Sequence, residues 1–282
     1  MTSPPEISAL NARGRWPPPD GPRVAIVGSR RPSPYGEAVA EQLAADLARA
    51  GVIVISGLAL GCDAAAHRGA LLGGGVTIAV MGTGVDIVYP AAHFRLAEEI
   101  LGAGGALVSQ FPNGTSPRRH NFPARNVTMA ALSDAVVVVE AVQGSGALIT
   151  AEAALELHKE VMAVPGSIFS PLSVGTHALI RDGAGLVQNA RDVLGALGVG
   201  REVLDDPLKA PRRLGFELLG ERDGILIHLS DVLTVSAAEL ARKLHLPISE
   251  VLGRLTSLEL DGAVRRHGAG YVRALRRAKE RA

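Results

Sequence analysis

The sequence has a single cysteine, Cys62, and only 3% of its 282 residues are aromatic. One cysteine excludes a disulfide framework and a cysteine-rich zinc site. Asp63 and His67 have no third ligand beside them in the sequence, so we expect no bound metal. No apolar run reaches the roughly 18 to 20 residues that cross a bilayer, and no charged region followed by an apolar stretch marks a signal peptide. We therefore expect a soluble, cytoplasmic protein with no membrane partner, whose core is built from Ala, Val, Leu and Ile.

Residues 1–21 lack apolar periodicity and contain five prolines, so we predict a flexible leader there. From Arg23 onward, short apolar runs alternate with helical patterns. Continuous Val, Ile and Ala runs are typical of parallel strands that are covered on both faces. The alternation predicts an α/β fold with an extended, Rossmann-like, doubly wound and mostly parallel sheet over residues 22–200.

The boundaries of these elements follow from the apolar patterns. The expected strands are Val24–Val27, Val52–Ile55, Thr77–Met81, Ala106–Val108, Ala135–Val139, Val161–Val164 and Gly185–Gln188. The expected helices are Tyr35–Arg49, Ala64–Leu72, Phe94–Leu101, Arg125–Leu132, Ala147–His158 and Thr176–Arg181.

A change of character follows a proline-containing linker at 201–214. Ser236–Leu244 and Ile248–Leu260 have helical spacing of apolar residues, and 263–273 has the pattern of a hairpin with glycines at its tip. Helix, turn, helix and hairpin is the order of a winged helix. We therefore predict a small winged-helix domain with a basic tail over residues 215–282.

The turn after the first strand is the strongest candidate for a binding site. Gly28 lets the backbone turn sharply, and Ser29 and Arg30 follow it. Backbone N–H groups, a helix N-terminus and an arginine together form an anion site, with phosphate as the best-suited anion. A solvated arginine on a tight turn is the alternative. The glycines of a dinucleotide fingerprint are missing, so we expect no cofactor.

A second glycine-rich turn, Ser56–Asp63, opens the next helix. Asp63 is suited to capping that helix, and His67, one turn later, is more typical of a half-buried helix residue than of a ligand-contacting group. No Ser, His and Asp constellation has a persuasive order. Glu140, Glu152 and Asp63 each have an ordinary explanation at a helix or strand end, so we assign no catalytic residue.

Acidic residues are absent between Ile100 and Ser133, a segment that holds three arginines and one histidine. Phe122 lies inside this basic cluster. Arginines beside an aromatic ring are what single-stranded nucleic acid requires, because charge binds phosphates and a ring stacks on bases. A solvated basic loop is the alternative.

A further turn, with Ser145 and Gly146, would present N–H groups at a helix N-terminus. Together with the earlier turns it completes a set of motifs whose order resembles the DprA/Smf family of DNA-processing proteins over about residues 22–195. The resemblance is carried by Gly28–Arg30, Ser56–His67, Met81–Pro90, Phe122–Asn126, Ser145–Ala151 and Val164–Ser167.

This resemblance implies a protein without turnover that binds and protects incoming single-stranded DNA and helps to load the RecA recombinase on it during natural transformation. The implied DNA contacts are Gly28, Ser29, Arg30, Arg118, Arg119, Phe122, Arg125, Asn126, Ser145 and Gly146. Many members have a basic residue directly before the Ser-Gly pair, where this chain has Gly144. One phosphate contact of the family is therefore missing here.

The resemblance also implies a homodimer formed through the end of the Rossmann-like domain. The matching residues are His177, Ile180 and Leu186; ordinary core packing is the alternative for the last two. The predicted winged helix has seven Lys or Arg from Arg265 to Arg281. Because its second helix offers only Arg254 and two glutamates, weak contact with duplex DNA and docking of a protein both stay open.

An enzymatic alternative comes from the lysine-decarboxylase-like nucleotide phosphoribohydrolases, which have a related fold. Their glycine-rich signature is similar to Gly144–Glu152 only in part. The glutamate and the paired glycines of that signature are out of register in this chain, which argues against hydrolysis.

Overall fold

The structure is a computed structural model that describes residues 9–199, 224–229 and 234–273. They form an N-terminal α/β unit and a C-terminal unit, and each is described by itself. The predicted linker and basic tail, and the start of the predicted leader, lie largely outside the described residues.

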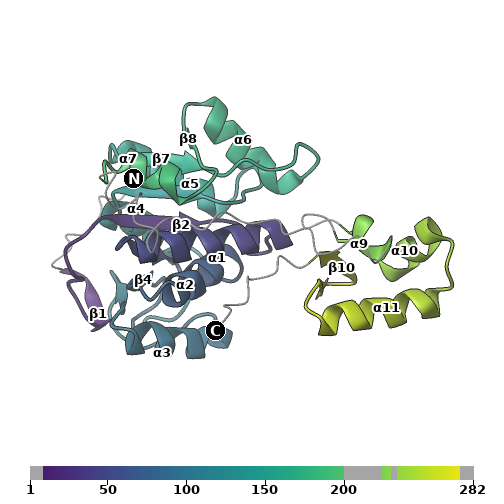
Figure 1. Ribbon diagram of the computed structural model, residues 1–282. Coiled ribbons are helices and arrows are strands. Elements are labelled where there is room, and N and C mark those ends of the chain that lie inside the picture. The colour runs from purple at the N-terminus through teal and green to yellow at the C-terminus, as the bar shows by residue number, and fades with distance from the viewer. Residues whose placement is uncertain (1–8, 200–223, 230–233, 274–282) are drawn as a thin grey trace. The chain divides into compact units, whose positions relative to one another are not determined.

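An eight-stranded sheet forms the centre of the N-terminal unit (Figure 1), in the order β1-β5-β4-β3-β2-β6-β7-β8. All neighbouring strands are parallel except β1 and β5. This confirms the predicted fold class. The strands are β1 (Asn11–Gly14), β2 (Arg23–Val27), β3 (Ile53–Ser56), β4 (Thr77–Val80), β5 (Ala106–Ser109), β6 (Ala135–Val138), β7 (Glu160–Ala163) and β8 (Gly185–Leu186).

Helices cover both faces of this sheet. They are α1 (Pro34–Arg49), α2 (Cys62–Leu72), α3 (Phe94–Gly102), α4 (Asn121–Leu132), α5 (Gly146–Glu156), α6 (Val174–Arg181) and α7 (Ala190–Ala196), with 3-10 turns at Ala91–His93 and Pro171–Ser173.

The core lies between these layers and follows the alternation of side chains along a strand. Val80 packs with Met129 of α4 on one face, while the next residue, Met81, packs with Ile100 of α3 on the other. All four side chains are buried. The Val, Ile and Ala runs of the inner strands are explained by this two-sided burial, and polar residues occur only at the ends of these strands.

The predicted flexible leader, residues 1–21, contains a strand at residues 11–14 that the sequence pattern does not indicate. β1 pairs antiparallel with β5, Leu10 beside it is buried, and Arg13 forms an ion pair with Glu98 at 2.9 Å. A four-residue strand held mainly by backbone pairing needs no apolar alternation. The sequence pattern therefore could not reveal it.

The chain reverses its direction of winding at β2, because β3 lies on one side of this strand and β6 on the other. In open α/β sheets, ligands bind at such a switch point, beyond the carboxyl ends of the strands. This end of the sheet, here called the carboxyl edge, carries the loops after β2, β3, β4, β6 and β7.

The C-terminal unit contains α9 (Gly224–Ile227), α10 (Ala237–Leu244), α11 (Ile248–Leu260) and the hairpin β9 (Val264–His267) and β10 (Gly270–Arg273). Its core includes Leu240, Val251 and Leu255. Val235 forms an isolated antiparallel bridge to Tyr271 of β10. The predicted winged helix is confirmed. Among the residues that the structure describes, no helix of either unit is long and apolar enough to cross a membrane.

Candidate nucleic-acid interface

The turn after β2 is fixed against the start of α2. The N–H of Cys62 donates to the Ser29 carbonyl at 3.1 Å, and the N–H of Arg31 donates to Ser29 Oγ at 3.1 Å. A side chain at Gly28 would meet the Cys62 sulfur at 2.6 Å, so this position requires glycine. The turn presents Arg30 as an exposed side chain.

Side chains from two loops and from the first turn of α4 meet at this turn: Arg30, Tyr89 and Phe122. The Arg30 guanidinium carbon lies 5.4 Å from the centroid of the half-buried Phe122 ring. The ring of Tyr89, which is 47% exposed, lies 5.8 Å from that of Phe122 at an interplanar angle of 40°. A cation and two aromatic rings thus form a continuous surface at the carboxyl edge. Tyr89 lies in the Met81–Pro90 motif, but it is not among the site residues predicted from the sequence.

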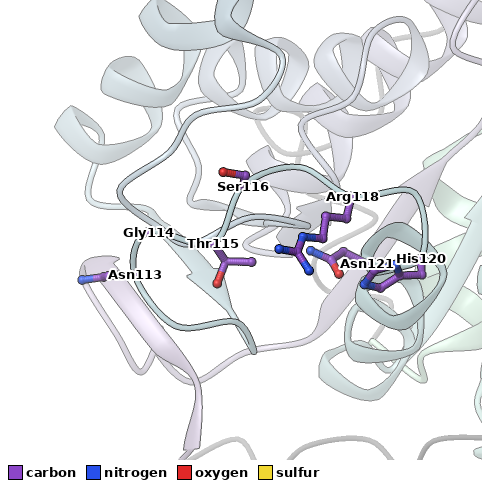
Figure 2. A pocket seen from close by; sticks show the side chains of 7 residues that line it. All are labelled: Asn113, Gly114, Thr115, Ser116, Arg118, His120 and Asn121. Carbon is purple, nitrogen blue, oxygen red and sulfur yellow. The ribbon is translucent and has the colours of Figure 1, made fainter.

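The part of the acid-free segment between β5 and α4 forms a loop beside this surface. A cavity of about 390 Å³ opens there (Figure 2), lined by Asn113, Gly114, Thr115, Ser116, Arg118, His120 and Asn121. Figure 2 shows the Arg118 side chain on the same side of the cavity as Asn121. Arg118, Arg119 and His120 are all exposed. Neither arginine has an ion-pair partner within the part of the chain that the structure describes, so their charges face solvent.

Arg125 differs from the other arginines because it is only 4% exposed. Its Nη1 donates to the Gly57 carbonyl and, at 2.7 Å, to the Val80 carbonyl, while its Nε donates to Asn126 Oδ1 at 3.0 Å. The guanidinium therefore joins the loop after β3 to the end of β4. These contacts favour a positioning role for Arg125 over the direct DNA contact expected from the sequence.

Asp63 is the buried counterpart of this arginine. It accepts the N–H groups of Gly57 at 3.1 Å and Ala59 at 3.3 Å, so it fixes a loop and does not cap α2. Burial raises the pKa of Asp63, and the nearby Arg125 and Arg30 act in the opposite direction. Burial lowers the pKa of Arg125, which Asp63 opposes.

His67 is fully buried, more deeply than we expected. Its Nδ1 lies 2.7 Å from Thr77 Oγ1, which in turn donates to the Val54 carbonyl at 2.8 Å. Thr77 therefore accepts from a neutral His67 that carries its proton on Nδ1. Burial, followed by repulsion from His93, Arg125 and Arg68, lowers the pKa of His67 to about 3.

The start of α5 lies at the same edge. Asn126 Nδ2 donates to the Gly146 carbonyl at 2.9 Å and ties α4 to this helix. The Ser145 N–H donates to the Val142 carbonyl at 3.1 Å, so it is not available to a ligand as we had expected. The hydroxyls of Ser145 and Thr150 are buried without a partner among the described residues. Gly146 is the first residue of α5.

The candidate dimer residues lie on α6 and β8. Leu186, in the last strand of the sheet, is 43% exposed, and His177 and Ile180 are half-buried. His177 Nε2 lies 3.1 Å from the Gly166 carbonyl oxygen. Partial exposure leaves all three side chains accessible to a partner.

Known proteins resemble this chain over both units. The family model of the DNA recombination-mediator protein A fits residues 1–198, and that of the DprA winged helix domain fits residues 209–270. Protein Smf of Escherichia coli is 42% identical over 262 residues, 91% of this chain and 68% of that protein. DNA processing protein DprA of Streptococcus pneumoniae is 46% identical over 173 residues, 61% of each chain.

Solved structures agree with these similarities. DNA processing protein A from Streptococcus pneumoniae has a TM-score of 0.58 at 45% identity, over 62% of this chain and 61% of its own. The protein from Helicobacter pylori, described for its single-stranded DNA binding mode, has a TM-score of 0.60 at 29% identity, over 70% of this chain and 93% of its own. With its family model spanning residues 1–198, the chain belongs to the DNA recombination-mediator protein A family.

Proposed function

We propose that the chain binds single-stranded DNA along the carboxyl edge of its sheet, without turnover. The observation that carries this proposal is the Arg30, Phe122 and Tyr89 surface, with ring and cation 5.4 Å apart at the switch point. A base stacks on the Phe122 ring, and the flanking phosphates bind Arg30. The Helicobacter pylori relative, described for its single-stranded DNA binding, supports the same ligand.

The exposed cations supply the sequence-independent part of the affinity. Arg118 and Arg119 extend the positive surface past Phe122, in a segment without acidic residues. The Gly146 end of α5 adds a helix N-terminus on the other side of β2. Ser29 contributes indirectly, because its hydroxyl fixes the turn that carries Arg30. Asn126 contributes by holding the start of α5 in place.

The biological role extends this binding. The protein acts in the cytoplasm as a homodimer, protects incoming single strands during transformation and delivers them to the RecA recombinase. Support comes from the family and from the partly exposed His177, Ile180 and Leu186. Light scattering of the full chain measures the dimer, and the rate at which RecA filaments assemble on a single strand measures the delivery.

The test of binding is fluorescence anisotropy with labelled oligothymidylate of about 16 nucleotides, the upper end of the site sizes in single-strand-binding folds. We expect the full chain to prefer the single strand over a duplex. Phe122→Ala should weaken binding roughly 5- to 150-fold, since a stacked base contributes about 1 to 3 kcal/mol. Phe122→Tyr keeps a ring and should remain close to the parent protein.

Two results would contradict this proposal. One is equal affinity for single strand and duplex, because stacking needs unpaired bases. The other is release of free base from a nucleoside monophosphate by the purified protein. Such release would favour the phosphoribohydrolase alternative.

A further inference from the structure

The turn after β7 presents two large apolar side chains to solvent. The Ser170 N–H donates to the Ser167 carbonyl at 3.0 Å, and the Phe169 N–H donates to Ser167 Oγ at 3.2 Å. Ile168 and Phe169 are thus the central residues of a hydrogen-bonded turn, 81% and 86% exposed. Such positions usually hold Gly, Pro, Asn, Asp or Ser. Two adjacent apolar residues there mark a contact surface.

This turn is fixed to the loop that precedes α5. The Ala141 N–H donates to the Leu172 carbonyl at 2.7 Å, and the Gly175 N–H donates to the Ala141 carbonyl at 2.8 Å. His177 Nε2 lies 3.1 Å from the carbonyl oxygen of Gly166, at the root of the turn. The segment that carries Phe169 is therefore tied to the segment that carries the N-terminus of α5.

Charge at this end of the edge is compatible with a polyanion. Residues 141–151 and 164–176 contain no acidic side chain. A DNA strand that leaves the Arg30 surface meets a helix N-terminus and then a neutral loop, with no carboxylate from either segment to repel its phosphates. A ring at the end of this path offers what a base needs.

We infer that Phe169 is a second base-stacking side chain, and that the bound strand runs across the carboxyl edge from Phe122 to Phe169. This inference rests on the proposed single-stranded DNA binding. Phe122 packs against Gly82 after β4, and Phe169 follows β7, four strands along the sheet. At about 4.8 Å per strand the path is roughly 19 Å long. That is about six nucleotides at the 3.4 Å spacing of B-form DNA, and fewer in an extended strand.

The experiment uses the full chain and three labelled probes: an oligothymidylate of about 12 nucleotides, one of about three, and an abasic strand of the longer length. Phe169→Ala should weaken binding of the long oligothymidylate roughly 5- to 150-fold. It should leave the short probe, which cannot reach both rings, and the abasic strand unchanged. Phe169→Trp should retain the affinity. Leu72→Ala removes an exposed side chain (51%) at the far end of α2 and should change nothing.

Three results would overturn the inference. Unchanged binding of the long probe excludes stacking on Phe169. An equal loss with the abasic strand shows that the variant acts on backbone contacts. If Phe169→Ala lowers the molecular mass measured by light scattering, and DNA affinity falls only as far as this loss of dimer explains, the turn contacts a second copy of the chain. If Phe122→Ala weakens binding while Phe169→Ala does not, the proposed function stands and only this extension fails.

Discussion

Two layers of polar side chains lie at the carboxyl edge of the sheet, and they use their hydrogen-bonding groups differently. The buried layer consists of Ser56, Asp63, Asn121, Arg125 and Asn126, whose side chains bond to backbone groups or to one another. The exposed layer consists of Arg30, Tyr89, Arg118, Arg119 and His120, together with the half-buried Phe122. The first layer shapes the loops, and the second faces solvent.

The difference teaches that proximity to a binding site does not define a role in binding. Arg30 and Arg125 both lie near Phe122, with guanidinium carbons 5.4 Å and 6.0 Å from the ring centroid. Only Arg30 is exposed. Variants in the buried layer should therefore change stability, whereas variants in the exposed layer should change DNA affinity and its salt dependence.

The largest effect is expected from Arg125→Met. The substitution leaves the carbonyls of Gly57 and Val80 without their donor and Asp63 buried without its cation. A hydrogen bond from a charged donor contributes about 1.5 to 3 kcal/mol, so losing two of them costs about 3 to 6 kcal/mol. Urea unfolding should show a loss of this size.

Arg118→Met is the matched control, because the same change in the exposed layer should leave the free energy of unfolding within about 0.5 kcal/mol. If both variants unfold at the same urea concentration, the separation into two layers is wrong.

Replacing Arg30, Arg118 and Arg119 together by alanine should weaken single-stranded DNA binding on the order of 100-fold. Each phosphate contact to a single strand contributes about 0.7 to the slope of log affinity against log salt, so the slope should fall by about 2. Anisotropy titrations over a range of salt concentrations measure both quantities.

The control is Arg15→Ala, an exposed arginine beside the start of β5, at the opposite end of the sheet. It should leave the salt slope unchanged. A triple variant with an unaltered slope would remove these arginines from the DNA site.

Much of the fold could be predicted because it depends on local patterns. Continuous Val and Ile runs located the inner strands within one or two residues. β1 was missed because its pairing with β5 is made by backbone groups about 95 residues away. α7 was also missed, although the capping box of Asn189 and Asp192 is a visible signal for its start.

The arrangement of the candidate site could be predicted less completely, because burial is a property of the folded chain. Arg118 and Arg125 belong to one acid-free segment and look alike in sequence. Only the packing of α4 places Arg125 under the loops while Arg118 stays outside. Tyr89 was not predicted as a site residue because its contact with Phe122 joins the loop after β4 to the start of α4.

Burial of His67 makes the free energy of unfolding depend on pH. The pKa of His67 is lowered from 6.5 to about 3, so below pH 6.5 the unfolded chain binds a proton that the folded chain does not. The contribution to stability is complete above pH 6.5 and is lost as the pH falls towards 3. From pH 7 to pH 5 we expect a loss of about 2 kcal/mol in the free energy of unfolding.

Urea unfolding at the two pH values measures this change. His67→Leu should remove most of it, whereas His120→Leu, in the exposed layer, should not. Equal pH dependence in the parent protein and His67→Leu would show that other groups control the acid response.

The smallest effect tests the start of α5, where the exposed layer has no cation. Gly144 precedes the Ser145 and Gly146 pair, and a side chain there would meet nothing within 4 Å. Gly144→Lys should place an ammonium beside the helix N-terminus, tighten single-stranded DNA binding a few-fold and steepen the salt slope by about 0.7. The gain is limited because Gly144 has φ of +72°, a conformation that costs a lysine roughly 1 kcal/mol.

Gly51→Lys controls for both the charge and the strain of this substitution. Gly51 has φ of +83°, also has open space around its Cβ position, and precedes β3 at the opposite end of the sheet. Both variants should unfold at similar urea concentrations, but only Gly144→Lys should bind DNA more tightly. Equal gains from the two would show that net charge attracts the strand. A gain from Gly144→Lys alone would show that the bound strand passes the N-terminus of α5.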